Sequence, residues 1–310
     1  MRVLVTGGAG FIGSHVVDAL VARRDDVLVL DDLSHGRQEN VDGRAVLAVL
    51  DVRDLQAVRA VFDDLRPELC FHLAAQADVR VSVERPDHDC AVNVLGTIGV
   101  LEAARRHGTQ VVFASTGGAI YGECERPAQE DAPRLPLSPY GASKLAGEEY
   151  LATYNRLYGA GHVSMRLGNI YGPRQDPHGE AGVVAIFLGR LARGEAPRIY
   201  GDGRQVRDYV YVGDVVRAAL AAAGRPPGVF NVGTGRATSV LELAEACRRV
   251  TGVEVEPVFD AARLGELARS VLDPGLAERE LGFLAETELE AGLAATWESI
   301  REGVARAGAN

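Results

Sequence analysis

The chain has 310 residues, 47% of them hydrophobic, and a formal net charge of -10 at pH 7. This size and composition allow a core large enough for one large domain or two smaller ones. The negative charge disfavours a broad nucleic-acid surface, so any anionic ligand needs a local basic pocket. The four cysteines are scattered without a C-x-x-C pair or nearby histidine ligands, which predicts neither a disulfide framework nor a metal site.

The start of the chain predicts a cytoplasmic protein. Met1 leads almost at once into an apolar run, without the charged and apolar regions of a signal peptide. The sequence contains no apolar stretch long enough to span a bilayer. We therefore expect no contact with a membrane.

The first half of the chain alternates short apolar runs with amphipathic stretches. This alternation is typical of βαβ units, whose strands form a parallel sheet. A helix is predicted from Ser138 toward Tyr158, before the last of these runs. The predicted strands lie at residues 3–5, 27–30, 46–50, 69–73, 111–114 and 163–167. The sequence thus predicts an α/β fold with a doubly wound, parallel Rossmann sheet.

After residue 167 the sequence pattern changes, because glycine and proline divide the chain into short elements. This pattern predicts a smaller α/β domain toward the C-terminus, which would bind the substrate. Residues 206–212 and 228–232 have strand character, and we expect them to return to the first sheet. The predicted division is a cofactor-binding domain at 1–167 with return segments near 206–235, and a substrate domain at 168–205 and 236–310.

The sequence GGAGFIG at residues 7–13 follows an apolar run and begins an apolar helix. In that context glycines allow a tight turn and let a pyrophosphate approach the helix N-terminus. The segment therefore predicts a dinucleotide site. The residues expected to contact the cofactor here are Gly7, Gly10, Phe11, Ile12 and Gly13.

Acidic residues end the next two predicted strands. Asp31, followed by Asp32, lies where a carboxylate accepts hydrogen bonds from the adenosine ribose and repels a 2'-phosphate. NAD is therefore favoured over NADP, although Arg37 lies close in sequence. Asp51 and Val52 either face the adenine, or Asp51 caps the next helix, and the sequence leaves both interpretations open.

A second motif, SPYGASK at residues 138–144, carries a candidate base. Ser138 is a good N-cap and Pro139 suits the first helical position, so Tyr140 and Lys144 should share one helix face. A phenol titrates near pH ~10 in water, and a nearby ammonium favours its anionic form. Tyr140 is therefore a candidate general base.

Together these motifs resemble the extended short-chain dehydrogenase/reductase family, within it the UDP-glucose 4-epimerases and related nucleotide-sugar epimerases. The resemblance implies interconversion of UDP-glucose and UDP-galactose by transient C4 oxidation with tightly bound NAD, in galactose metabolism. The motifs that carry it are GGAGFIG (7–13), FHLAAQ (71–76), NVLGT (93–97), STGGAIYG (115–122), SPYGASK (138–144), GNIYGPR (168–174) and RDYV (207–210).

The resemblance also implies roles for single residues. Tyr140 would remove the proton of the sugar 4-hydroxyl, while Lys144 lowers the pKa of Tyr140 and binds the nicotinamide ribose. Without the family, residues 73–75 would be assigned to a core strand and Asn93 to a backbone contact within a helix. With it, the nicotinamide side of the site is expected to contain Leu73, Ala74, Ala75, Gln76 and Asn93.

A third hydroxyl usually assists the tyrosine, and here the sequence departs from the pattern. Gly117 occupies the usual serine position, so we expect Thr116 to assist, with Ser115 as the alternative. Related sugar dehydratases carry an Asp-Glu pair at the positions of Gly117 and Gly118. Because this chain has no carboxylate there, the resemblance favours epimerisation over dehydration or decarboxylation.

For the substrate, the resemblance implies contacts from the second half of the chain. Glu266 stands where the family often has aspartate. The usual contact to the ribose would therefore have to be made by a longer carboxylate side chain. Ser270 stands where epimerases restricted to unsubstituted sugars carry a bulky side chain, so we expect UDP-N-acetylhexosamines to be accepted. The other expected contacts to the nucleotide, diphosphate or sugar are Asn169, Arg207, Tyr209 and Arg263.

Two other functions remain open from the sequence. One is a UDP-glucuronate 4-epimerase, and the other is a non-catalytic NAD-binding regulatory protein, which would be expected to lack Tyr140 or Lys144. The resemblance further implies a homodimer formed through residues 94–105 and 145–154. His178 is assigned to a turn, because the assigned chemistry needs no second base.

Overall fold

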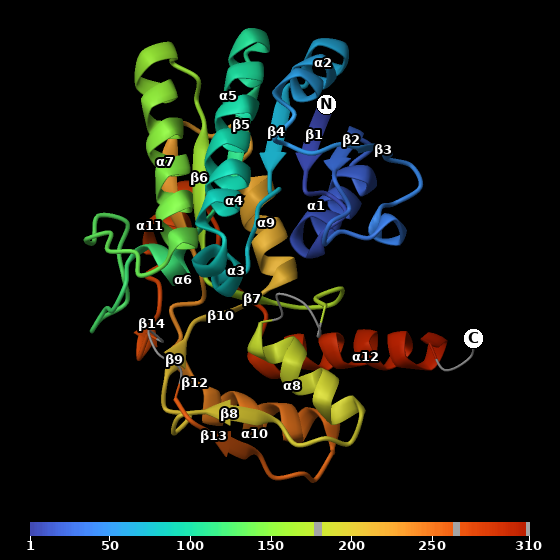
Figure 1. Ribbon diagram of the computed structural model, residues 1–310, viewed down its shortest axis with the longest axis vertical. Helices are drawn as coiled ribbons and strands as arrows, with labels where there is room; N and C mark the ends of the chain where they lie inside the picture. The colour runs from blue at the N-terminus through green and yellow to red at the C-terminus, as the bar shows by residue number, and fades with distance from the viewer. Residues whose placement is uncertain (177–181, 263–266, 308–310) are drawn as a thin grey trace.

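The computed structural model describes residues 1–176, 182–262 and 267–307. Its centre is a seven-stranded parallel sheet with the order β11-β6-β5-β4-β1-β2-β3 (Figure 1). The doubly wound parallel sheet expected from the sequence is therefore confirmed. Its strands are β1 (Arg2–Thr6), β2 (Asp26–Asp31), β3 (Val46–Val49), β4 (Leu69–His72), β5 (Gln110–Thr116), β6 (Val163–Leu167) and β11 (Gly228–Val232).

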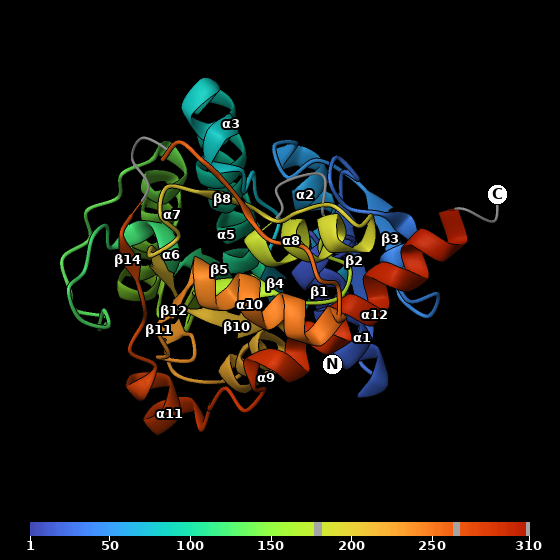
Figure 2. The ribbon, with the colours of Figure 1, turned by 90° about the horizontal axis from the view of Figure 1, so that it is seen from below.

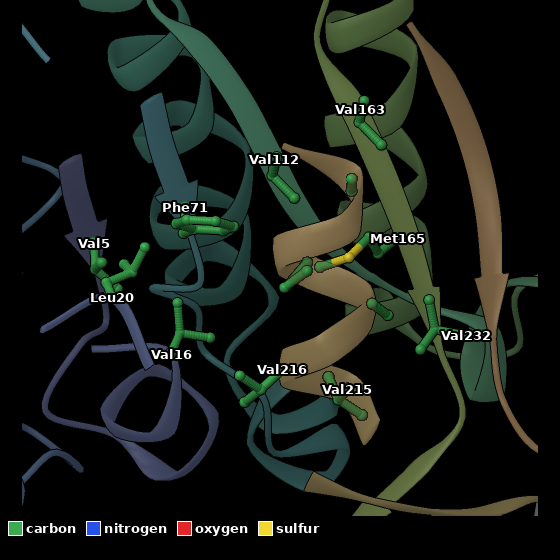
Figure 3. Packing of buried hydrophobic residues seen from close by; sticks show 14 of the residues in the cluster. Val5, Val16, Leu20, Phe71, Val112, Val163, Met165, Val215, Val216 and Val232 are labelled. Carbon is green, nitrogen blue, oxygen red and sulfur yellow. The ribbon is translucent and has the colours of Figure 1, made fainter. Parts of the chain in front are cut away.

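Alternate side chains of the strands build a core on each face of the sheet, as the two-residue period of a strand requires. On one face, Val5 and Phe71 pack with helices α1, α9 and α11, and Figure 3 shows part of this cluster. On the other face, Leu4 and Cys70 pack with α2, α5 and α7. The helices are α1 (Phe11–Ala22), α2 (Leu55–Leu65), α5 (Gly96–His107), α7 (Pro139–Tyr158), α9 (Val212–Ala222) and α11 (Gly275–Leu281).

Short elements connect the sheet to its helices near the carboxyl ends of the strands. Between β4 and α5 the chain forms three consecutive turns of helix, the last of them π-helical. These elements are η1 (Gln38–Asn40), α3 (Val79–Glu84), α4 (Pro86–Cys90), η2 (Ala91–Leu95) and α6 (Gly117–Ile120).

A smaller α/β part lies beyond the carboxyl ends of the strands, toward which the arrowheads of β1 and β4 point in Figure 1. Figure 2, seen from that side, shows α8, α10 and α12 in front of the sheet. These three helices share one apolar core that contains Leu188, Leu243 and Trp297. The helices of this part are α8 (Val183–Ala192), α10 (Val240–Thr251) and α12 (Leu289–Ala307).

The smaller part contains three short sheets, ordered β10-β7, β12-β9-β14 and β13-β8. Residues 228–232 join the large sheet as expected, but residues 206–212 do not. That segment forms β9 and β10, which pair outside the large sheet, and then begins α9. The strands are β7 (Asn169–Tyr171), β8 (Arg198–Tyr200), β9 (Val206–Arg207), β10 (Tyr209–Tyr211), β12 (Thr238–Ser239), β13 (Val258–Asp260) and β14 (Arg269–Ser270).

Candidate functional site

The glycine turn between β1 and α1 is closely packed. Gly7 has a φ of +71°, and a Cβ atom there would lie 2.6 Å from the amide nitrogen of Ala74. A Cβ atom on Gly13 would lie 2.0 Å from the carbonyl oxygen of Gly7. Side chains at these positions would push α1 away from β1 and from the segment after β4. Gly10 is the N-cap of α1, so Phe11, Ile12 and Gly13 form the first helical turn.

Asp31 ends β2 beside this turn and is 6% exposed. Its carboxylate accepts hydrogen bonds from the N–H groups of Ala9 and Leu33, both over 2.9 Å. Burial raises the pKa of Asp31, and the two N–H donors oppose that effect. A helix N-terminus and a fixed carboxylate thus flank a turn with no room for side chains at Gly7 and Gly13, and this arrangement fits a dinucleotide.

Other residues of the expected adenosine side are held by local partners. Asp32 accepts hydrogen bonds from Ser34. Asp51 pairs with Arg53, and Asp54 is the N-cap of α2, so the interpretation of Asp51 as a helix cap is wrong. The cap is three residues later, where the Asp54 side chain accepts from the N–H of Ala57. Contact of Asp51 and Val52 with adenine remains a prediction.

Arg37 is the residue whose positive charge could favour NADP. It forms an ion pair with Asp176 over 3.7 Å and another with Glu39 over 3.9 Å. Its side chain is 60% exposed. These carboxylates neutralise the positive charge that would attract a 2'-phosphate.

A chain of hydrogen bonds fixes the tautomer of His72 at the end of β4. Thr97 Oγ1 donates to the carbonyl oxygen of Asn93 over 2.6 Å, so it accepts from His72 Nε2 over 3.0 Å. His72 Nδ1 then accepts from Thr6 Oγ1 over 2.7 Å, and Thr6 Oγ1 accepts from the N–H of Ala74. Burial lowers the pKa of His72 to about 3, which keeps the ring neutral.

Gln76 and Asn93, both expected at the nicotinamide side, bind each other. Asn93 Oδ1 accepts from the Gln76 N–H, and Asn93 Nδ2 donates to the Gln76 carbonyl, both over 2.9 Å. Asn93 Nδ2 also lies 3.1 Å from Asp89 Oδ1 and from Ser143 Oγ. Asn93 belongs to the π-helical turn η2, a feature that is frequent at functional sites. The structure thus joins Gln76 to Asn93, while Leu73 and Ala74 contact Thr6 at the end of β1.

Helix α7 presents Tyr140 and Lys144 as the sequence predicts. Ser138 Oγ accepts from the N–H of Gly141 over 3.1 Å, and Pro139 occupies the first turn. A Cβ atom on Gly141 would lie 2.5 Å from the Ala119 carbonyl, so α7 begins in close contact with α6. Tyr140 is half-buried in that first turn, one helical turn before Lys144.

Lys144 is 3% exposed. Its Nζ donates to the carbonyl oxygen of Ala114 over 2.9 Å and lies 4.9 Å from the centre of the Phe113 ring. Burial lowers the pKa of Lys144 to about 8, against the charges of Asp89 and Glu148. It is also the single lysine among the 33 Lys and Arg residues of the chain. Arginine does not replace a compact ammonium at a site of this kind.

The two candidate helper hydroxyls point to different surroundings. A Cβ atom on Gly118 would lie 3.8 Å from Thr116 Oγ1 and 3.7 Å from Asn169 Oδ1, so both groups face the same space. Ser115 Oγ is buried and, among the described residues, has no hydrogen-bond partner. A Cβ atom on Gly117 would lie 2.5 Å from Leu272 Cδ1, which explains why no side chain occupies the usual serine position.

Strand pairing gathers the expected substrate residues. Asn169 in β7 is the register partner of Tyr209 in β10, and Ser270 in β14 is the register partner of Arg207 in β9. The N–H of Asn169 donates to the carbonyl oxygen of Asp208 over 2.8 Å. Of these residues, Asn169 also faces the space beside Gly118 that Thr116 faces. Arg263, Glu266 and His178 lie outside the described residues.

Sequence reasoning missed two buried carboxylates. Asp208, fully buried, accepts from Thr234, Gly235 and Leu272 and so joins three segments around Arg207 and Tyr209. Burial raises its pKa. Asp89 accepts hydrogen bonds from the side chains of Gln76 and Asn93. Its position one helical turn before Asn93 is the sequence feature that could have predicted this contact.

The comparisons with known proteins identify the family of the chain. The model of the NAD dependent epimerase/dehydratase family matches residues 3–233. A UDP-glucose 4-epimerase from Mycolicibacterium smegmatis is 47% identical over 312 residues, covering 97% of this chain and 99% of that protein.

Two solved structures are similar over almost the whole chain. The UDP-glucose 4-epimerase of Thermotoga maritima with UDP-glucose has a TM-score of 0.96 and 46% identity, covering 98% of this chain and 100% of that one. The Thermus thermophilus UDP-glucose 4-epimerase complex with NAD has a TM-score of 0.92 and 47% identity, covering 97% and 99%. Within the described part of this chain, the helices are too short or too polar to cross a membrane.

Proposed function

Because the chain belongs to the NAD dependent epimerase/dehydratase family, we propose that it is a UDP-glucose 4-epimerase, which interconverts UDP-glucose and UDP-galactose. The observation that carries the proposal is the space beside Gly118. Thr116 Oγ1 and Asn169 Oδ1 face it from two parts of the fold, and α7 begins next to it. Residues 117 and 118 bring no carboxylate into that space, so nothing there would remove water from a keto sugar.

The dinucleotide cradle fits NAD, which when bound supplies a reversible acceptor for the hydride of the sugar C4. The residues proposed to hold it are Gly7, Gly10, Phe11, Ile12, Gly13, Asp31, Asp32, Asp51, Val52, Leu73, Ala74, Ala75, Gln76 and Asn93. The Gly7–Gly13 contact and the fixed Asp31 carboxylate support this assignment.

The chain's own residues handle the proton at the sugar O4. Tyr140 accepts that proton in one direction and returns it in the other, as a general base and acid. The Lys144 ammonium, one turn along α7, favours the phenolate, because a nearby positive charge stabilises an anion. Thr116 orients the 4-hydroxyl toward Tyr140.

The substrate is held by residues of the short sheets. Arg207 supplies positive charge for the diphosphate. Asn169 and Tyr209, which are partners in the paired strands β7 and β10, supply further contacts to the substrate. Arg207 Nη1 donates to the carbonyl oxygens of Val206 and Leu267, which orients the guanidinium before substrate arrives. Arg263 and Glu266 remain predictions from the sequence.

The test is to incubate the purified protein separately with UDP-glucose, UDP-N-acetylglucosamine and UDP-glucuronate, adding no NAD, and to follow the C4 epimers by NMR. We expect UDP-galactose from UDP-glucose, and none from the Tyr140→Phe variant. A deoxy-keto sugar would contradict the proposal, as would conversion of UDP-glucuronate alone. A folded protein that contains NAD and converts none of the three would support the regulatory alternative.

The same experiment tests the expectation for Ser270. This serine is 7% exposed and is the register partner of Arg207, which supports a place for its small side chain near the substrate. We expect UDP-N-acetylglucosamine to be converted, and a Ser270→Tyr variant to lose that conversion while keeping activity on UDP-glucose.

We propose a homodimer in which α5 and α7, which pack on each other, face a second copy. Leu95, Tyr150 and Leu157 lie on these helices or next to them, and their exposures are 54%, 40% and 66%. Exposed apolar side chains gathered on neighbouring helices are typical of an interaction surface. The cytoplasmic location remains a prediction from the sequence.

A further inference from the structure

Asp89, in α4, is a buried carboxylate that the proposed chemistry does not use. It is 1% exposed. Its Oδ1 accepts hydrogen bonds from Gln76 Nε2 over 3.0 Å and from Asn93 Nδ2 over 3.1 Å. Burial of a carboxylate is costly unless a charge or several donors compensate for the lost water. The two donors found here are neutral amides, so they compensate for part of the lost water and leave the negative charge without an ionic partner.

Lys144 is the candidate positive partner, because α4 packs on α7 and Asn93 Nδ2 bridges Asp89 and Ser143, the neighbour of Lys144 in the chain. The negative groups acting on its buried ammonium are Asp89 and Glu148. Glu148 is already neutralised, because Arg166 binds both of its oxygens over 2.7 to 3.1 Å. Asp89 forms no ion pair within 4 Å among residues 1–176, 182–262 and 267–307, so no arginine or histidine there neutralises it, and its effect on Lys144 acts over more than 4 Å.

The other groups around Lys144 supply no charge of this kind. His72 on β4 is kept neutral by its hydrogen bonds to Thr6 and Thr97. Phe113 and the Ala114 carbonyl on β5 are uncharged, although both attract an ammonium. Tyr140, on the same helix, is the group on which the ammonium is proposed to act.

Asp89 also accepts from two amides whose orientation is set by backbone groups. Gln76 Oε1 accepts from the N–H of Asp78, and Asn93 Oδ1 accepts from the N–H of Gln76. The amide NH2 groups of both residues therefore turn toward Asp89. One carboxylate is thus a shared acceptor that ties these two side chains together.

We propose that Asp89 is a positioning residue with two effects: it holds the amides of Gln76 and Asn93, and it is the counterion of the buried Lys144. This inference rests on the proposed site but adds a residue that does not touch the substrate. It predicts that removing the Asp89 charge makes Lys144 lose its proton at lower pH.

The single lysine allows a direct measurement. Protein labelled with 13Cε-lysine gives one lysine signal, which reports Lys144 and no other residue. The signal would be titrated in the wild type and in Asp89→Asn, Asp89→Glu and Asp87→Asn, using protein without a lysine-containing tag. Asp87, on the same short helix, is exposed and pairs with Arg85, so it is a matched control.

We expect the midpoint of the Asp89→Asn signal to fall by about one pH unit, the size expected for loss of one nearby opposite charge. Asp89→Glu should stay closer to the wild type, and Asp87→Asn should match it. We also expect Asp89→Asn to retain less NAD on purification, because the two amides lose a common acceptor. A purely structural role would lower the melting temperature without moving the midpoint.

A folded Asp89→Asn protein with an unchanged midpoint would overturn the proposal. If that variant does not fold, Asp89→Ser, which leaves room for water, provides a second neutral variant with the same expected shift. The titration needs no turnover, so its result is independent of whether the protein epimerises UDP-glucose. If the Tyr140→Phe variant still converted UDP-glucose, the proposed function of Tyr140 would be overturned. The measurement on Asp89 would still stand.

Discussion

Lys144 Nζ donates a 2.9 Å hydrogen bond to the carbonyl oxygen of Ala114. This contact joins the helix that carries Tyr140 to the strand that ends in Thr116. The proposed base, its cation and the helper hydroxyl are therefore fixed relative to one another before any substrate binds. Pre-organisation of this kind is what general acid–base catalysis requires.

Replacing Lys144 tests the need for a compact ammonium. Lys144→Arg keeps the charge but adds a larger, planar group to a closely packed position. We expect kcat to fall by about 10²-fold or more, within the range for general acid–base groups. In the wild type, the rate should decline above about pH 8, because the ammonium then loses its proton. Steady-state kinetics from pH 6 to 10 would check both, and near-normal turnover by Lys144→Arg would contradict the assignment.

Gly13→Ala tests the dinucleotide-binding turn at residues 7–13. The added Cβ would meet the Gly7 carbonyl at 2.0 Å, so α1 must move. We expect a loss of about 1 to 3 kcal/mol in the free energy of unfolding, typical of overpacking, together with loss of co-purified NAD. Gly43→Ala is the control, since a Cβ there meets nothing within 4 Å. Denaturant unfolding and the NAD content of the purified protein would provide the comparison.

Thr116→Val and Ser115→Ala separate the two helper hydroxyls. We expect Thr116→Val to lower kcat by about 10²-fold with little change in stability. Ser115→Ala should keep its activity and be as stable as the wild type or more so, because it removes a buried hydroxyl that lacks a partner. The opposite pattern in kcat would assign the role to Ser115.

Two buried histidines should weaken the fold in mild acid. His162 Nδ1 accepts from the N–H of Val111 over 3.0 Å, so protonation there breaks that bond. Burial lowers the pKa of His72 to about 3 and that of His162 to about 4. Each folded-state pKa is depressed, so the associated stability is present above the unfolded value of 6.5 and is lost as the pH falls.

Between pH 6.5 and 5, each histidine should therefore cost about 2 kcal/mol in the free energy of unfolding. Urea unfolding at pH 7.5, 6.5, 5.8 and 5 would measure this slope. The His162→Asn variant should be less stable at pH 7.5 but lose less stability on acidification. An equal slope in variant and wild type would exclude His162 as its source.

The proposed dimer surface can be tested by charge. Leu95→Glu and Leu157→Glu should convert a dimer into a monomer, because a carboxylate would be buried without a partner in the interface. Leu284→Glu is the control, since Leu284 is 53% exposed and its carbonyl contacts α9, on the other face of the sheet. Light scattering after size-exclusion chromatography gives the mass. A wild-type monomer would contradict the proposal.

Local chemistry explains why much of the fold and site could be read from the sequence. A glycine turn, an acidic strand end and an N-capped helix each depend on residues close in the chain. The local sequence therefore predicts the structure of residues 7–13, Asp31 and residues 138–144. The expected return of residues 206–212 to the large sheet was wrong, whereas residues 228–232 do join it. Strand propensity does not say which edge a strand will pair with.

The sequence by itself determined the parallel sheet, the dinucleotide turn and the spacing of Tyr140 and Lys144, because periodicity and capping act within a few residues. The tertiary structure decided the contacts between distant segments. Examples are the exclusion of a side chain at 117 by Leu272, the shared space of Thr116 and Asn169, and the burial of Asp89 beneath Gln76 and Asn93. Such contacts depend on how separate elements pack, and that information is not carried by any local pattern.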